Sequence, residues 1–167
     1  MSDLRFAGGC QCGAVRFALH KMPHKPCICH CRMCQKAAGN LFGAFAGVDI
    51  EFFELTRGEI TWWVSSSAGE RGFCRDCGTP LAWRPPEHDY IAMTTGSFDQ
   101  PEVMRPIFNY GAESMLPWLH EVIAIPATVT GASGPQVKAS DDPHYERIHQ
   151  TNRQHPDHDT AEWPPRN

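Results

Sequence analysis

Eight cysteines, most of them in short clusters, constrain this sequence more than any other feature. Cys27 stands two residues before the second cluster, and the clusters themselves are Cys10 and Cys12 as C-x-C, Cys29, Cys31 and Cys34 as C-x-C-x-x-C, and Cys74 and Cys77 as C-x-x-C. The first residues lack the basic-then-apolar layout of a signal peptide, so we expect a cytoplasmic protein. In the reducing cytosol, clustered cysteines bind metal or carry out chemistry more often than they form disulfides. A secreted disulfide scaffold is the less favoured alternative.

Length and charge narrow the class further. A chain of 167 residues is expected to form one domain, here residues 1–132, followed by a tail of residues 133–167. The net charge of −4 argues against a nucleic-acid partner, because such surfaces carry a basic excess. The mean hydropathy is −0.40 and no long apolar run is present, so we expect no membrane span. The sequence leaves open whether copies associate into a homo-oligomer.

Short segments of strand character, separated by glycine and proline turns, predict an all-β domain with little helix. Residues 14–20 alternate apolar and polar, and residues 41–48 read as a strand buried on both sides. Further strands are expected at residues 4–6, 60–64, 81–83 and 90–95, with apolar segments at 107–110 and 119–125. Pro26 cannot donate in a ladder, so the strand that bears Cys27 should begin after it. Residues 32–38 are expected to form a short helical turn that ends at Gly39.

The tail has few aliphatic residues and is expected to be extended or disordered, because it cannot bury enough apolar surface to fold alone. Four histidines in this tail suggest metal binding, but they lack a compact ligand spacing, so a solvated or partner-docked tail is favoured. They are His144, His149, His155 and His158.

Two of the cysteine clusters suit a closed metal site. Structural zinc takes four tetrahedral ligands, often thiolates from two short-spaced pairs on separate turns. The pairs Cys10/Cys12 and Cys74/Cys77 lie beside glycine turns, which let backbone N–H groups approach the thiolates. One zinc ion held by these four would tie the start of the domain to its middle.

The middle cluster offers only three thiolates, Cys29, Cys31 and Cys34, and this is the layout of a catalytic zinc with one open position. Cys27 is either a fourth ligand, which would make this site structural, or a buried apolar cysteine. His30 lies between two ligands and is expected to point away from the metal. A thioredoxin-like role lacks its βαβ context, and the spacing fits no ferredoxin-type cluster.

The stretches that carry these clusters resemble the glutathione-dependent formaldehyde-activating enzyme (GFA) family. The resemblance spans roughly residues 5–127 and rests on Gly9-Cys10-Gln11-Cys12-Gly13, on residues 29–36, on residues 73–81, on the stretch 41–47 and on residues 95–99. It implies a β-tent of packed antiparallel sheets with zinc knuckles. It also implies two zinc ions per chain, one structural on Cys10, Cys12, Cys74 and Cys77, and one catalytic on Cys29, Cys31 and Cys34.

The activity that the resemblance implies is that of a carbon–sulfur lyase, which adds glutathione or a similar small-molecule thiol to formaldehyde or a related small carbonyl compound, reversibly. Lys36, Arg32, Arg71 and Arg75 are candidates for the carboxylates of a glutathione-like substrate, although each is more often a solvated surface charge. Trp62, Trp63 and Trp83 are expected in the core rather than in a pocket wall. The alternative function is a non-catalytic, zinc-stapled carrier of thiol adducts or binder of a protein partner.

Overall fold

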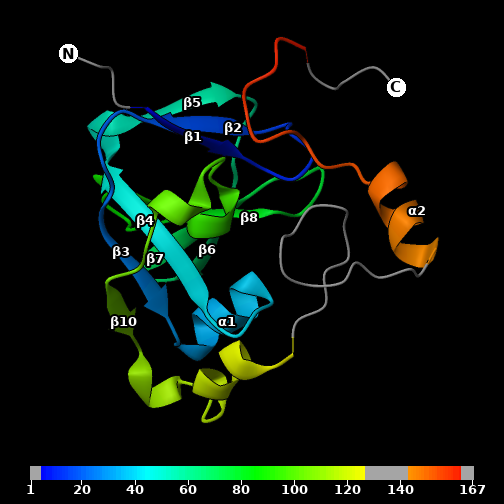
Figure 1. Ribbon diagram of the computed structural model, residues 1–167. Coiled ribbons are helices and arrows are strands. Elements are labelled where there is room, and N and C mark those ends of the chain that lie inside the picture. The colour runs from blue at the N-terminus through cyan, green and yellow to red at the C-terminus, as the bar shows by residue number, and fades with distance from the viewer. Residues whose placement is uncertain (1–4, 127–142, 163–167) are drawn as a thin grey trace.

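The computed structural model describes residues 5–126 and 143–162 (Figure 1). This part of the chain contains two α-helices, α1 (Arg32–Ala38) and α2 (Pro143–Thr151), and ten strands. The strands are β1 (Phe6–Gly9), β2 (Arg16–Leu19), β3 (His24–Cys29), β4 (Gly43–Asp49), β5 (Phe53–Arg57), β6 (Thr61–Ser66), β7 (Gly69–Phe73), β8 (Pro80–Arg84), β9 (Tyr90–Thr94) and β10 (Phe108–Tyr110). The all-β prediction is confirmed. Neither helix is long and apolar enough to cross a membrane.

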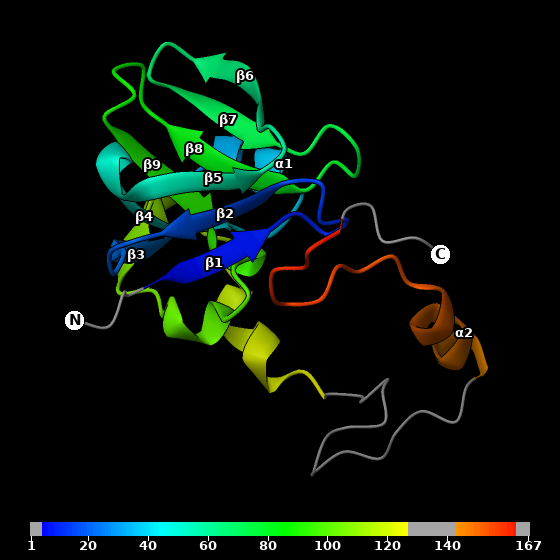
Figure 2. The ribbon, with the colours of Figure 1, turned by 90° about the horizontal axis from the view of Figure 1, so that it is seen from above.

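The strands form two sheets. A three-stranded sheet has the order β1-β2-β5, and a seven-stranded sheet has the order β10-β3-β4-β9-β8-β7-β6. Figure 2 shows the small sheet stacked against the large one. Every pairing is antiparallel except that of β10 with β3, which is parallel.

The hydrophobic core lies between the two sheets. The small sheet contributes Phe17 and Leu19, both fully buried, and the large sheet contributes Val48, Ile91 and Met93. Phe17 meets Phe98 edge to face, with ring centroids 5.2 Å apart. Because side chains alternate along a strand, the residues between these core positions point to the opposite face of the large sheet. That second face carries the functional features described below.

An ion-pair network ties the small sheet to the loop that follows β9 and to the C-terminal segment. Arg16, 2% exposed, donates two hydrogen bonds to Asp99, at 2.8 and 2.6 Å, and a third to Asp159 at 3.0 Å. Arg5 also reaches Asp159, at 2.8 Å. Burial alone would raise the pKa of Asp159, but the hydrogen bonds from Arg5 and Arg16 hold it below its usual value.

Two features differ from the sequence expectations. β3 begins at His24 and includes Pro26, because the β3–β4 register shifts between His24 and Cys27 and leaves the proline outside the regular ladder. The segment at residues 119–124 is a 3-10 helix. Other 3-10 turns occupy Ile50–Phe52, Thr95–Ser97, Pro101–Val103 and Ala112–Ser114.

The described part of the tail, residues 143–162, also departs from the expected extended or disordered chain. Residues 143–151 form α2, where Gln150 donates to Glu146 and the hydroxyl of Thr151 donates to the carbonyl of Arg147, both at 2.7 Å. The i,i+4 side-chain pair of Gln150 with Glu146 supports this exposed helix. Residues 152–162 then return to the small sheet, where Asp159 meets Arg16. The predicted boundary at residue 132 lies outside the described residues and stays a prediction.

Candidate metal centres

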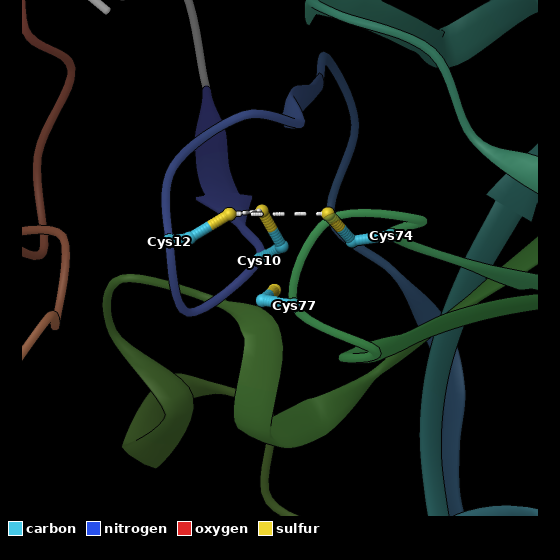
Figure 3. Close-up of side chains that lie close together, drawn as sticks. All are labelled: Cys10, Cys12, Cys74 and Cys77. Atoms are coloured by element: carbon cyan, nitrogen blue, oxygen red, sulfur yellow. Dashed lines mark hydrogen bonds between the residues drawn. The ribbon is translucent and has the colours of Figure 1, made fainter. Parts of the chain in front are cut away.

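The first cysteine cluster joins the two sheets. Cys10 and Cys12 lie on the turn between β1 and β2, and Cys74 and Cys77 lie on the turn between β7 and β8. Figure 3 shows the four side chains converging from these two turns. The four Sγ atoms all lie within 4.8 Å of one another.

The spacing of these sulfurs suits tetrahedral coordination. A zinc–sulfur bond of about 2.3 Å places the sulfurs of a tetrahedral site about 3.8 Å apart. The Sγ atoms of Cys10 and Cys12 are 3.6 Å apart, and those of Cys12 and Cys74 are 3.9 Å apart. Cys10 and Cys74 are buried in the core, 3% and 0% exposed. The donor set and its spacing therefore fit a structural zinc ion.

The two turns are built alike and are tied to each other. Gly13 and Gly78 each follow the second cysteine of a pair, with φ of +78° and +77°, a conformation that glycine adopts without strain. The backbone N–H of Val15 donates to Cys10 Sγ at 3.3 Å. Thr79 Oγ1 accepts from the N–H of Gln11 at 3.0 Å and lies 3.1 Å from Cys77 Sγ, so one hydroxyl links both turns.

The second cluster lies where β3 passes into α1. Cys29 ends β3, Cys31 is the N-cap of α1, and Cys34 lies in its first turn. Cys31 Sγ accepts the N–H of Cys34 at 3.4 Å, which satisfies a donor that the helix itself leaves unpaired. The helix ends at Gly39 in the left-handed conformation, as predicted. The three Sγ atoms lie within 4.8 Å of one another.

A neighbouring segment holds this cluster in place. The N–H of His30 donates to the carbonyl of Tyr110 at 2.8 Å, and the side chain of Gln35 donates to the carbonyl of Ser114 at 3.1 Å. Gly111 approaches so closely that a Cβ there would fall 2.8 Å from the backbone nitrogen of Cys31. The parallel pairing of β10 with β3 brings this segment, 80 positions along the chain, against the cysteines.

Thiol acidity differs within each cluster. Burial raises the pKa of Cys29 to about 12 and also raises that of Cys12. Burial likewise opposes ionisation of Cys31, but hydrogen bonds from the backbone N–H groups of Met33 and Cys34 and from the neighbouring thiols of Cys29 and Cys34 together outweigh it and lower the pKa. At Cys77, hydrogen bonds with Thr79 and Cys12 together overcome burial and lower the pKa to about 6. Crowded thiols of this kind ionise together only when a cation balances their charge, and this too fits a bound metal.

The three-cysteine cluster opens onto a cavity of about 430 Å³. All seven strands of the large sheet contribute to its wall. The cavity is lined by Cys27, Cys29, Cys31, Met33, Cys34, Phe45, Ser65, Ser66, Ala68, Arg71, Trp83, Tyr90, Ala92 and Tyr110. The four-cysteine cluster, by contrast, contributes no residue to this wall.

Glycines in β4 make room for the aromatic wall. A Cβ on Gly43 would fall 2.6 Å from the ring of Phe45, and one on Gly47 would fall 2.4 Å from the hydroxyl of Tyr90. Phe45 and Tyr90 therefore lie across the two glycine positions. Burial raises the pKa of Tyr90 to about 12, so its hydroxyl keeps its proton at neutral pH.

The structure places the other predicted site residues relative to the cavity and the cysteine groups. Cys27 lines the cavity but belongs to neither group of sulfurs in the described chain. His30 is not in the three-cysteine group; it is 1% exposed, and its Nε2 lies 3.1 Å from Asn109 Oδ1. Of the four cations considered for substrate carboxylates, Arg71 lines the cavity. The others, Arg32, Lys36 and Arg75, are exposed outside it.

The tryptophan prediction holds for one of three residues. Trp62 packs against the core, with the Arg84 guanidinium 3.7 Å from its ring centroid. Trp63 is 61% exposed, and Trp83 lines the cavity, because the register places both beside Arg71 on the outer face of the large sheet. Tyr90 and Tyr110 were not expected at the site, since only pairings distant in sequence bring them to it.

The tail histidines join no metal-ligand group among the described residues; the side chain of His149 lies outside them. His155 has a different place: it is 4% exposed and covers the first cysteine turn. The backbone N–H of His155 donates to the carbonyl of Gln11 at 2.7 Å, and the His155 ring lies over Gly13.

Gly13→Ala is expected to release residues 152–162, because the new Cβ would fall 2.1 Å from Cδ2 of His155. Gly78→Ala is the matched control: it has the same positive φ but nothing within 4 Å of its Cβ. Trypsin cleavage after the exposed Arg153 tracks the open population and should rise about tenfold or more in the first variant alone. Equal cleavage in both variants would contradict the docking described here.

The fold and the clusters together define a β-sheet protein with two groups of cysteine sulfurs, one closed between the sheets and one open to a cavity. The family model described as glutathione-dependent formaldehyde-activating enzyme matches residues 5–112, and the chain belongs to this family. That family is one of enzymes of the formaldehyde-activating type.

A solved structure adds a weaker likeness. A Rhodobacter sphaeroides protein of known crystal structure shares 18% sequence identity with this chain, with a TM-score of 0.45. The match covers 55% of this chain and 85% of that one. No curated protein matches the chain.

Proposed function

We propose that this protein is a zinc-dependent carbon–sulfur lyase that adds a small thiol, glutathione or a similar compound, to formaldehyde or a related carbonyl compound, reversibly. The observation that carries the proposal is the three-cysteine cluster at the wall of a 430 Å³ cavity, in a chain of the formaldehyde-activating family. We propose a structural zinc on Cys10, Cys12, Cys74 and Cys77 and a catalytic zinc on Cys29, Cys31 and Cys34.

The reaction forms one carbon–sulfur bond. The thiol sulfur attacks the carbonyl carbon, the C=O π bond opens, and the proton lost by the thiol returns to the new alkoxide oxygen, giving a hydroxymethyl thioether. A zinc ion held by Cys29, Cys31 and Cys34 would supply a Lewis acid that favours the ionised form of an incoming thiol.

The chain's own residues prepare this site. Cys31 and Cys34 are fixed by the start of α1, so the sulfurs need little rearrangement. Tyr90, whose hydroxyl keeps its proton, can donate a hydrogen bond to an oxygen that gains negative charge in the cavity.

The test is a rate measurement against the spontaneous reaction, since thiols add to formaldehyde without a catalyst. Proton NMR exchange spectroscopy would measure the rate at which the hydroxymethyl thioether forms at fixed pH, with and without the protein. The expected result is a rate proportional to protein concentration and abolished when zinc is removed. Thiol binding without any rate increase would contradict the enzyme and support the carrier function.

A further inference from the structure

Arg71 is a cation with unused hydrogen-bonding capacity at the wall of the cavity. Its Nη2 donates to Cys34 Sγ at 3.4 Å, while its Nε is buried and has no hydrogen-bond partner among the described residues. Within residues 5–126 and 143–162, no carboxylate forms an ion pair with it. With one hydrogen bond to a sulfur and no carboxylate partner among the described residues, this guanidinium at the cavity wall is suited to an acceptor that arrives with a ligand.

The register of the large sheet fixes where this cation lies. Arg71 on β7 is opposite Trp83 on β8, which is opposite Ala92 on β9. These three side chains therefore share one row across the cavity wall. A ligand group on Arg71 consequently lies beside the Trp83 indole and close to Cys34.

The rest of the wall is largely apolar. Phe45, Trp83, Tyr90 and Tyr110 provide aromatic surface, and, cysteines apart, Arg71 is the only charged side chain lining the cavity in the described chain. A pocket with mostly apolar walls and one charged group favours a ligand of the same composition. Any further charge on the ligand would be buried here without a partner, and this would oppose binding.

We propose that Arg71 binds a carboxylate of the thiol substrate, and that this substrate is a compact mercaptocarboxylate with an aromatic or other apolar substituent. Arg71 contacts Cys34, one of the three cysteines at which we propose that the substrate thiol binds. The carboxylate and the thiol of the substrate must therefore be separated by only a few bonds. Glutathione, with two carboxylates and an ammonium group, fits this wall less well. The inference rests on the proposed function and names its substrate class.

A binding measurement tests the carboxylate site without turnover. The probes are 3-phenylpropanoate and its carboxamide, titrated calorimetrically into the zinc-loaded protein; neither carries a thiol. The acid should bind about tenfold or more tightly than the amide, because a charge-assisted bidentate bond to arginine is lost in the amide. Equal affinity of the wild-type protein for both probes would overturn the proposal.

Substitutions locate the effect. Arg71→Met should bring the ratio of the affinities for acid and amide close to one. Arg71→Lys should keep part of this ratio, because lysine keeps the positive charge but lacks the paired N–H donors of the guanidinium. Arg75→Met, on the exposed turn outside the cavity, is the matched control and should leave the ratio unchanged. A ratio that survives in Arg71→Met would contradict the assignment, and the wild-type comparison stands even if that variant fails to fold.

Turnover then separates this inference from the proposed function. The ratio of kcat/KM for 2-mercapto-3-phenylpropanoate to that for glutathione should exceed about ten. A larger kcat/KM for glutathione would overturn the substrate class while leaving the lyase function intact. Probe binding as predicted, with no thiol accelerated, would overturn the lyase function while leaving the carboxylate site intact.

Discussion

Cys74→Ser is expected to unfold the domain rather than to weaken one contact. Cys74 is fully buried in the core and belongs to the cluster that joins the turns of both sheets. Structural zinc contributes about 10–16 kcal/mol in small zinc-binding peptides. A whole domain is stable by about 5–15 kcal/mol. Loss of this zinc site is therefore comparable to the total stability.

Circular dichroism during heating, together with zinc analysis, measures this effect. The variant should lose its cooperative thermal transition and its zinc. Cys27→Ser is the matched control, because Cys27 is only partly buried and belongs to neither sulfur group. A Cys74→Ser protein that keeps both its transition and a full complement of zinc would show that the four-cysteine cluster does not hold a structural metal.

Cys31→Ser is expected to abolish turnover while the protein stays folded. Cys31 is the N-cap of α1, and serine is a favoured residue there, so its hydroxyl can accept the Cys34 N–H in place of the sulfur. The helix start is thereby preserved while one of three thiolates is lost. The rate above the spontaneous reaction should fall by about a hundredfold or more, since a Lewis-acid site contributes several kcal/mol.

The same heating experiment shows whether Cys31 is needed for stability, because loss of a structural residue would lower the temperature of the thermal transition. The thermal transition of Cys31→Ser should stay close to that of the wild-type protein, unlike that of Cys74→Ser. Glu54→Gln, in an exposed pair with His20, controls for the loss of a surface group. Unfolding of Cys31→Ser would instead assign a structural role to the second cluster.

Local patterns in the sequence predicted the cysteine groups and most strands, because ligand spacing and side-chain alternation are short-range properties. α1 with its stop at Gly39 was predicted for the same reason. Long-range pairings were not predictable. The parallel pairing of β10 with β3 and the bond of Arg16 to Asp159, 143 positions away, follow no local pattern.

Burial on the outer face was also beyond the sequence. Trp63 and Trp83 have the aromatic character of core residues, yet register places them beside Arg71 on the face that carries the cavity. Arg71 was one of four equivalent cations in the sequence. Its contact with Cys34 distinguishes it from the others only in the folded chain.

The central claim is that the chain holds two different metal sites, one closed and one open. The most direct test is the zinc content per chain of protein purified without chelator, for the wild type and for Cys31→Ser. We expect two zinc ions in the wild type and one in the variant, with the fold retained. One zinc ion in the wild type, unchanged by the substitution, would contradict the claim.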